Sequence, residues 1–177
     1  MKLRSTCAAA ALIVMAAAVT GCATGAKPDA MVAEKVAIAH QSSSNVTVAV
    51  SGGKSTSSMG ASQVSDSDFA QALSDSITKS GLFKEVAPSG GRYKLNAFIG
   101  KVDQPMMGFS MTVKMEVSYT LVDTKSGKTV WSKNVASEHT AKASEAFAGV
   151  KRLQLANEGA AKANIEQAIT EISAVEL

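Results

Sequence analysis

The sequence predicts an α+β domain, built as a two-layer sandwich with a mainly antiparallel sheet of about four strands and two helices on one face. Seven apolar residues alternate without exception with polar ones from Phe109 to Leu121. This alternation predicts a strand with one buried and one solvated face. Two other segments, 66–80 and 161–175, each carry one apolar stripe at helical spacing. One apolar sheet face and two one-sided helices can be buried together in such a sandwich.

Short runs of alternating apolar residues predict the strands. The predicted strands are 46–50, 93–99, 109–121 and 129–137. The last two are joined by a turn from Asp123 to Gly127, which predicts a hairpin. The predicted order of the elements is therefore β-α-β-β-β-α.

The ends of the first helix carry recognisable signals. Ser65 can cap the helix predicted over 66–80 by accepting a hydrogen bond from the backbone amide of Asp68, and Gly81 favours a left-handed stop. The start of the last helix is open, because Gly159 interrupts its pattern. The segment 145–157 either forms a separate turn or is continuous with that helix.

Residues 1–21 have the pattern of a secretory signal peptide. Two positive charges precede an unbroken apolar run from Ala8 to Val19. That run is too short to cross a membrane, because a spanning helix needs about 20 residues. Both cysteines, Cys7 and Cys22, lie within the first 22 positions, which excludes a disulfide or a thiolate metal site further along the chain.

The segment Val19-Thr20-Gly21-Cys22 resembles the bacterial lipobox, although Thr20 stands where Ala or Ser is usual. The resemblance implies that Cys22 receives a diacylglycerol, becomes the first residue of the mature chain and is then N-acylated. Several acyl chains, each contributing about 0.8 kcal/mol per buried methylene, make a stable anchor. In lipoproteins of this kind an Asp after the acylated cysteine retains the protein in the inner membrane, so Ala23 implies the outer membrane. The alternative is an ordinary signal followed by a chance cysteine.

The mature chain is predicted to consist of a lipid-anchored tether, 22–40, and a single periplasm-facing domain, 41–177. The tether lacks a clean hydrophobic period and contains Pro28. Loss of Lys2 and Arg4 with the signal leaves 16 basic against 15 acidic side chains, a balance that argues against nucleic-acid binding. The two histidines lie far apart in the sequence, which argues against a zinc site.

Much of the mature chain resembles a group of uncharacterised proteobacterial lipoproteins. The matching segments are 56–81, Tyr93, Gln104-Pro105, 117–123, Gly127, Trp131, Arg152 to Ala161 and Asn164-Ile165. A helix ending in Ser80-Gly81-Leu82-Phe83, an alternating strand pair and a terminal helix are distantly similar to envelope lipoproteins of the transport-auxiliary and lipopolysaccharide-assembly types. These resemblances imply a cell-envelope lipoprotein that supports envelope assembly or transport through protein or lipid contacts.

Some members of the first group carry the label UDP-N-acetylglucosamine acyltransferase. Such enzymes resemble left-handed β-helices built from hexapeptide repeats. The strict period of two between Phe109 and Leu121 does not fit a repeat of six, so we reject this activity.

Two other segments contain residues that are common in phosphate-binding or catalytic sites. Gly52-Gly53-Lys54-Ser55 lacks the spacing of a phosphate loop, and no predicted helix follows it directly, which favours a flexible solvated loop. His139 lies near Glu138 and Ser137, but no nucleophile-elbow motif is present. We predict no catalytic, cofactor-binding or metal-ligating residues and no enzymatic activity. The alternative is a lipid-anchored enzyme acting on envelope glycans or lipids.

Met106 and Met107 stand between Pro105 and Gly108, where a hairpin connection is expected. The favoured interpretation is that they fold back as core filler, and the alternative is that their flexible thioethers contact a partner. Asn157-Glu158-Gly159 is predicted to have a structural role in the last helix. The expected partners are the membrane, through acyl chains on Cys22, and an envelope protein of unknown identity.

Overall fold

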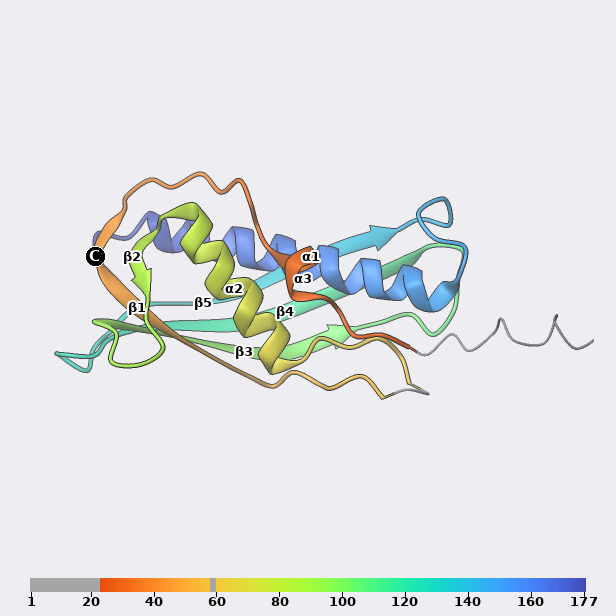
Figure 1. Ribbon diagram of the computed structural model, residues 1–177, viewed down its shortest axis with the longest axis horizontal. Helices are drawn as coiled ribbons and strands as arrows, with labels where there is room; N and C mark the ends of the chain where they lie inside the picture. The colour runs from red at the N-terminus through yellow and green to blue at the C-terminus, as the bar shows by residue number, and fades with distance from the viewer. Residues whose placement is uncertain (1–22, 58–59) are drawn as a thin grey trace, which may run out of the picture.

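The computed structural model describes residues 23–57 and 60–177. The predicted signal peptide and Cys22 lie outside these residues. Along the described chain the elements are α1 (Pro28–Met31), β1 (Ser42–Ser51), α2 (Asp66–Ser80), β2 (Phe83–Val86), β3 (Tyr93–Asp103), β4 (Met111–Asp123), β5 (Thr129–Ala141) and α3 (Gly149–Ser173) (Figure 1). The predicted α+β class is confirmed.

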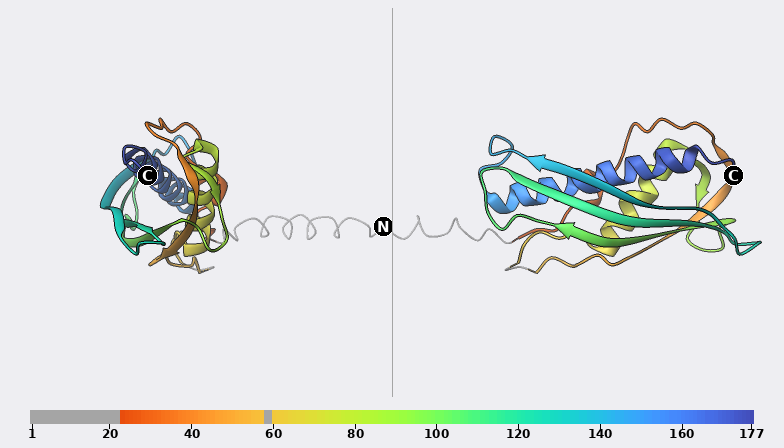
Figure 2. Two further views of the ribbon diagram at one scale, coloured as in Figure 1. Left: turned by 90° about the vertical axis from the view of Figure 1, so that its left-hand side faces the viewer. Right: turned by 180° about the vertical axis from the view of Figure 1, so that it is seen from behind.

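The described strands form one five-stranded sheet in the order β2-β1-β3-β4-β5. β1 is parallel to β2 and to β3, whereas β3, β4 and β5 form an antiparallel meander. α2 packs on β1 and β2, and α3 packs on β4 and β5. Both long helices therefore cover the same face of the sheet, as Figures 1 and 2 show.

One strand was missed, and the other four have bounds that differ from the prediction. β2 was missed, because its four residues are too few to show a period. β1, β3 and β5 are longer than predicted. β4 begins at Met111 and not at Phe109. Phe109 still belongs to the irregular connection that follows Gly108, and its side chain is exposed.

The two long helices follow their local signals. α2 has the predicted bounds: the Ser65 hydroxyl accepts a hydrogen bond from the Asp68 amide at 3.1 Å, and Gly81 adopts the left-handed conformation with φ of 69°. α3 is continuous from Gly149 to Ser173, which resolves the question of its start. Gly159 lies inside α3 where the ring of His139 occupies the space that a Cβ would need. The glycine that interrupts the pattern therefore permits a close contact between α3 and β5.

The core lies between the sheet and the helices. Val117, Tyr119 and Leu121 on β4 are fully buried, as the alternation predicts. The Tyr119 hydroxyl donates a hydrogen bond to Asn164 Oδ1 of α3 at 2.9 Å. Burial raises the pKa of the Tyr119 phenol well above its usual range, so the group remains a hydrogen-bond donor at all physiological pH values.

The segment predicted to be a tether is packed against the domain over most of its length. Met31, Val32 and Ala33 are buried in the core. The Ala33 amide donates a hydrogen bond to the hydroxyl of Ser76 on α2 at 2.9 Å. The four residues of α1 are too few to show a helical period, so this packing could not be predicted from the sequence. No helix in the described part of the chain combines the length and apolar character that a membrane span requires.

Candidate functional site

Five of the six large apolar side chains that are exposed in the described residues lie in two connections at one end of the molecule. Met106, Met107 and Phe109 belong to the connection between β3 and β4, and Phe147 and Val150 belong to the connection between β5 and α3 and to the first turn of α3. Their exposed fractions are 98%, 83%, 90%, 101% and 46%, in that order. We refer to these five residues as the apolar end. The other large exposed apolar residue, Phe98, lies on β3.

The antiparallel course of the strands brings the two connections together. β3 ends where β4 begins, and β5 returns alongside β4 so that Ala141 pairs with Met111. The connections border an open groove of about 580 Å³. Its walls include Pro105, Met106, Met107, Met111, Val150 and Leu153. A concentration of exposed apolar side chains of this kind is typical of an interaction site.

The favoured interpretation of Met106 and Met107 as core filler is wrong, because both side chains are almost wholly exposed. The connection that carries them lies between β3 and β4, at the end of the molecule where α3 begins (Figure 1). Neither methionine belongs to the hydrophobic core. Their role as partner contacts stays a prediction.

Arg152 on α3 holds the two connections in place. Its Nη1 atom donates hydrogen bonds to the carbonyl oxygens of Ala146 and Phe147, both at 2.8 Å. Its Nη2 atom donates to the carbonyl oxygen of Gly108 at 3.2 Å. A planar guanidinium with several fixed donors suits this task. The apolar side chains are thus presented from a backbone that α3 positions.

The described chain also begins at this end. Thr24 Oγ1 and the Gly25 carbonyl contact Gln154, which lies near the start of α3, at 2.9 and 3.1 Å. Figure 1 and the rear view in Figure 2 both place the start of the described chain at the end where α3 begins. The start of the described chain is therefore at the same end of the molecule as the apolar end.

Buried polar residues hold the surrounding elements together, and most of them were missed from the sequence. Asn157 Nδ2 donates a hydrogen bond to the Ser62 carbonyl at 2.9 Å, and Gln104 Nε2 donates to Asn157 Oδ1 at 2.8 Å. Glu158 Oε1 accepts from the backbone amide of Lys27 at 3.0 Å. The prediction that 157–159 has a structural role is confirmed. The sequence signal that could have identified these buried residues is the presence of amide and carboxylate side chains on an otherwise apolar helix face.

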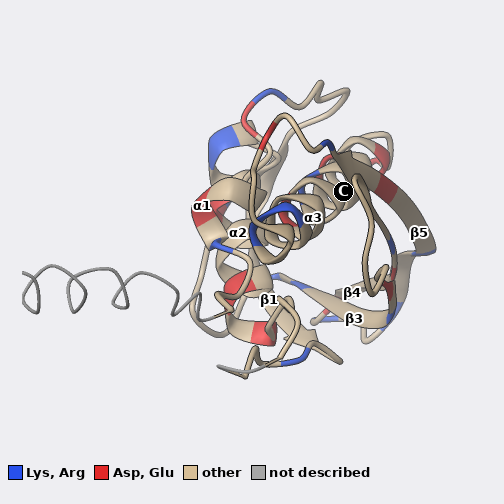
Figure 3. Ribbon diagram, turned by 90° about the vertical axis from the view of Figure 1, so that its right-hand side faces the viewer, with Lys and Arg blue, Asp and Glu red and all other residues tan. Residues whose placement is uncertain are grey.

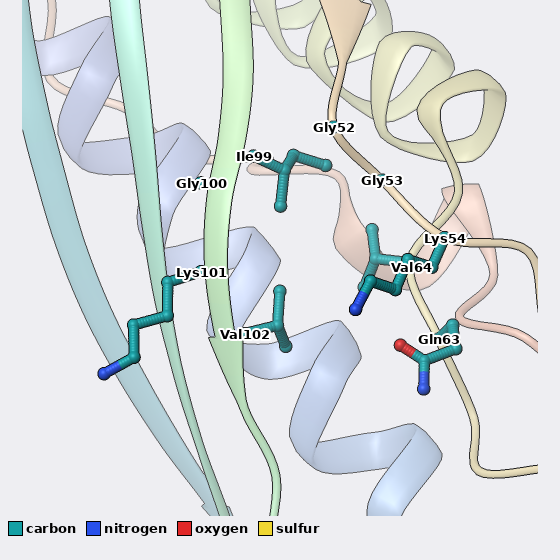
Figure 4. Close-up of a pocket in the computed structure, with 9 residues that line it drawn as sticks. All are labelled: Gly52, Gly53, Lys54, Gln63, Val64, Ile99, Gly100, Lys101 and Val102. Carbon is teal, nitrogen blue, oxygen red and sulfur yellow. The ribbon is translucent and has the colours of Figure 1, made fainter.

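In the loop Gly52-Gly53-Lys54-Ser55, the first three residues line a small cavity of about 70 Å³ beside β3 (Figure 4). Pockets for small molecules are typically about 300–1,000 Å³. The Gly53 amide donates a hydrogen bond to Asp66 Oδ1 at 2.6 Å, so a carboxylate stands where a phosphate loop would bind a phosphate. The Lys54 amide is bonded to the Val64 carbonyl at 2.9 Å. Gly52, Lys54 and Ser55 are exposed, as expected for a solvated loop, and the two hydrogen bonds connect the loop to the start of α2.

His139 is exposed on β5, and its ring packs against Gly159. The hydroxyl of Ser137, two residues earlier on the same strand, donates a hydrogen bond to the Ala160 carbonyl at 2.8 Å. Ser137 and Glu138 line an open surface pocket beside β4, but His139 is not among its lining residues. Within residues 23–57 and 60–177, no three His, Cys, Asp or Glu side chains are grouped in a way that could hold a metal ion.

Comparison with known proteins identifies the fold. No protein-family model matches the chain, and no curated protein sequence matches it. Protein XCC0632 from Xanthomonas campestris, of the family DUF330, matches in structure with a TM-score of 0.57 and 15% identity over 80% of this chain and 87% of its own. Protein CT253 from Chlamydia trachomatis has a TM-score of 0.50 and 8% identity over 75% of this chain and 99% of its own.

A minor lipoprotein from Acinetobacter baumannii has a TM-score of 0.48 and 10% identity over 73% of this chain and 92% of its own. Further structural neighbours are other bacterial lipoproteins and PelC. At these identities the comparisons bear on the fold alone.

Proposed function

We propose that the chain is a lipid-anchored cell-envelope lipoprotein that supports envelope assembly or transport through protein or lipid contacts and does not act as an enzyme. The observation that carries this proposal is the position of the apolar end beside the start of the described chain. Residues suited to association therefore lie next to the predicted acylation site, Cys22. Exposed apolar side chains contribute to association and little to folding.

The distribution of perturbed titratable groups supports a role without catalysis. Enzymes gather such groups in one cleft. Here the hydrogen bond and charge of Asp103 raise the pKa of Lys101 on β3. Partial burial raises the pKa of Glu171 on α3, but hydrogen bonds from Lys133 and Gln167 outweigh it and lower the pKa overall. With Tyr119, whose burial raises its pKa, these groups lie on three different elements and have separate local causes.

The proposed location is the outer membrane, with the domain facing the periplasm, and it rests on Ala23. Ala23→Asp is expected to move the protein to the inner membrane, because the sorting resemblance assigns retention to an Asp after the acylated cysteine. Separation of inner and outer membranes followed by immunodetection measures the distribution. The wild-type chain is expected in outer-membrane fractions and is expected to resist extraction by high salt and alkaline carbonate.

The matched control is Ala23→Ser, which keeps a small neutral side chain and is expected to stay with the outer membrane. An Ala23→Asp protein distributed like the Ala23→Ser protein would show that the sorting rule does not apply. Release of the wild-type chain by salt or carbonate would contradict the proposed lipid anchor itself.

A further inference from the structure

We infer that the apolar end inserts among the lipids of the bilayer to which the chain is anchored, so that the domain meets the membrane through Met106, Met107, Phe109, Phe147 and Val150. This inference rests on the proposed acylation of Cys22 and adds a second, non-covalent membrane contact. It assigns a phospholipid surface as the occupant of the groove between the two connections.

The first argument is the short distance between the anchor and the domain. The chain is bonded to Gln154 from Thr24 onward, and Ala26 is already buried. The predicted tether of 22–40 would have let the domain move far from the membrane, but this segment is packed. About 8 Å of chain separates the Cα atoms of Cys22 and Thr24 at most. A bilayer that holds acyl chains on Cys22 therefore lies against the end of the domain where Thr24 is bound.

The second argument is that the apolar end lies at that same end. Val150 precedes Gln154 by four residues on α3, which is about one helical turn of 5.4 Å. Arg152, between them, binds the carbonyl oxygens of Phe147 and Gly108, so both connections are fixed beside this turn. The apolar end and the first described residues thus lie at the same end of the molecule (Figure 1).

The third argument is the chemistry of the exposed groups. Phe and Met side chains in short connections suit the boundary between headgroups and acyl chains, where apolar protein groups insert about 5–10 Å. Lys142 and Lys151 are exposed on either side of Phe147, with Glu145 between them, and Lys151 Nζ donates a hydrogen bond to Gln154 Oε1 at 3.0 Å. Figure 3 views the molecule from this end. Basic side chains beside inserted apolar ones favour contact with phosphate headgroups.

The experiment places a fluorescent reporter at the apolar end of the full acylated chain. Met107→Cys and Phe147→Cys each provide one free thiol, because the thiol of an acylated Cys22 is blocked. Lys125→Cys is the matched control, since it lies in the exposed turn between β4 and β5 at the opposite end of the hairpin. Each protein is purified in detergent, its intact mass is measured, and it is labelled with a nitrobenzoxadiazole reagent. It is then reconstituted into vesicles of phosphatidylethanolamine and phosphatidylglycerol.

The measurement is quenching by nitroxide-bearing lipids and by aqueous iodide. Reporters at positions 107 and 147 are expected to lose emission by about twofold or more with a nitroxide near the headgroup and to be protected from iodide, as insertion of this depth requires. The reporter at position 125 is expected to be open to iodide and unaffected by nitroxide. Adding Met106→Ser and Met107→Ser to the Phe147→Cys chain is expected to reduce nitroxide quenching with little change in melting temperature, because both methionines are exposed.

Each other outcome overturns the inference. An acylated, vesicle-bound chain whose reporters at 107 and 125 are equally open to iodide would show that the apolar end faces water, and the proposed anchoring would stand. Protection from iodide without nitroxide quenching would show that a second copy covers the apolar end. A purified chain without the mass of the acyl groups would contradict both the anchoring and this inference.

Discussion

Val117→Asp is expected to unfold the domain or to leave it barely stable. Val117 is fully buried on β4 and pairs with Ile99 of β3 and Val135 of β5. A carboxylate there would be removed from water with no partner to bond it, at a cost of several kcal/mol. This cost is comparable to the total stability of a small domain, about 5–15 kcal/mol. Thermal or urea unfolding followed by circular dichroism measures the effect.

The control is Ser118→Asp, one residue further along the same strand. Ser118 is exposed on the opposite face of β4, where its hydroxyl donates a hydrogen bond to Asn134 Oδ1 at 2.6 Å. A surface change of this kind usually alters stability by no more than about 0.5 kcal/mol. Equal melting temperatures for the two variants would contradict a sheet that is covered on one face only.

Asn164→Leu is expected to lower the free energy of unfolding by roughly 1.5–4.5 kcal/mol, although leucine is apolar and of similar size. Asn164 on α3 is fully buried, accepts the hydrogen bond of the Tyr119 hydroxyl, and donates to the Val135 carbonyl at 2.9 Å. Leucine leaves the Tyr119 hydroxyl buried without a partner, which costs about 1–3 kcal/mol, and also removes the hydrogen bond to the Val135 carbonyl, worth about 0.5–1.5 kcal/mol. The free energy of unfolding in urea measures the loss.

Two variants test whether the lost hydrogen bonds of Asn164 cause this destabilisation. Tyr119→Phe in the Asn164→Leu background removes the orphaned hydroxyl and is expected to restore part of the lost stability, which is the signature of coupling in a double-mutant cycle. Gln167→Leu, on the exposed side of the same helix, is expected to change stability little. Additive effects of Tyr119→Phe and Asn164→Leu would show that the hydrogen bond between them does not stabilise the fold.

The elements that the sequence predicted well are those whose signals are local. The Ser65 cap and Gly81 stop determined the bounds of α2, because both act within one turn of the helix. The uninterrupted alternation identified the buried face of β4 from Met111 to Leu121. β2 has four residues, and the pairing of β1 with β3 joins segments far apart in the sequence, so neither leaves a local pattern.

The apolar end was only partly visible in the sequence. Met106 and Met107 stood out, but a sequence pattern does not say in which direction the side chains of a connection point. Phe109 continued the alternation of β4 and was therefore assigned to the core, whereas it lies outside the strand. Phe147 and Val150 lie near the other three residues only because β5 runs antiparallel to β4 and ends at the same end of the sheet. This proximity depends on strand pairing and leaves no pattern in the local sequence.

The segment between Thr24 and Ala33 packs against the domain, and this packing keeps the proposed anchor close to the apolar end. Its apolar side chains belong to a four-residue helix and the irregular segments on either side, so they show neither the helical nor the strand period. The polar groups that bind it, such as Gln154 and Glu158, lie about 130 residues further along the chain. Contacts of this kind follow from the tertiary fold and cannot be inferred from either segment alone.

Acylation of Cys22 is the central claim, and metabolic labelling with an alkyne analogue of palmitate tests it most directly. The wild-type chain and Cys7→Ser, which changes the other cysteine, are expected to incorporate the label, because the acyl acceptor is position 22. Cys22→Ser is expected to lose the label completely and to accumulate as an uncleaved or released form. Equal labelling of the Cys22→Ser and wild-type chains, or a wild-type chain without label, would contradict the account.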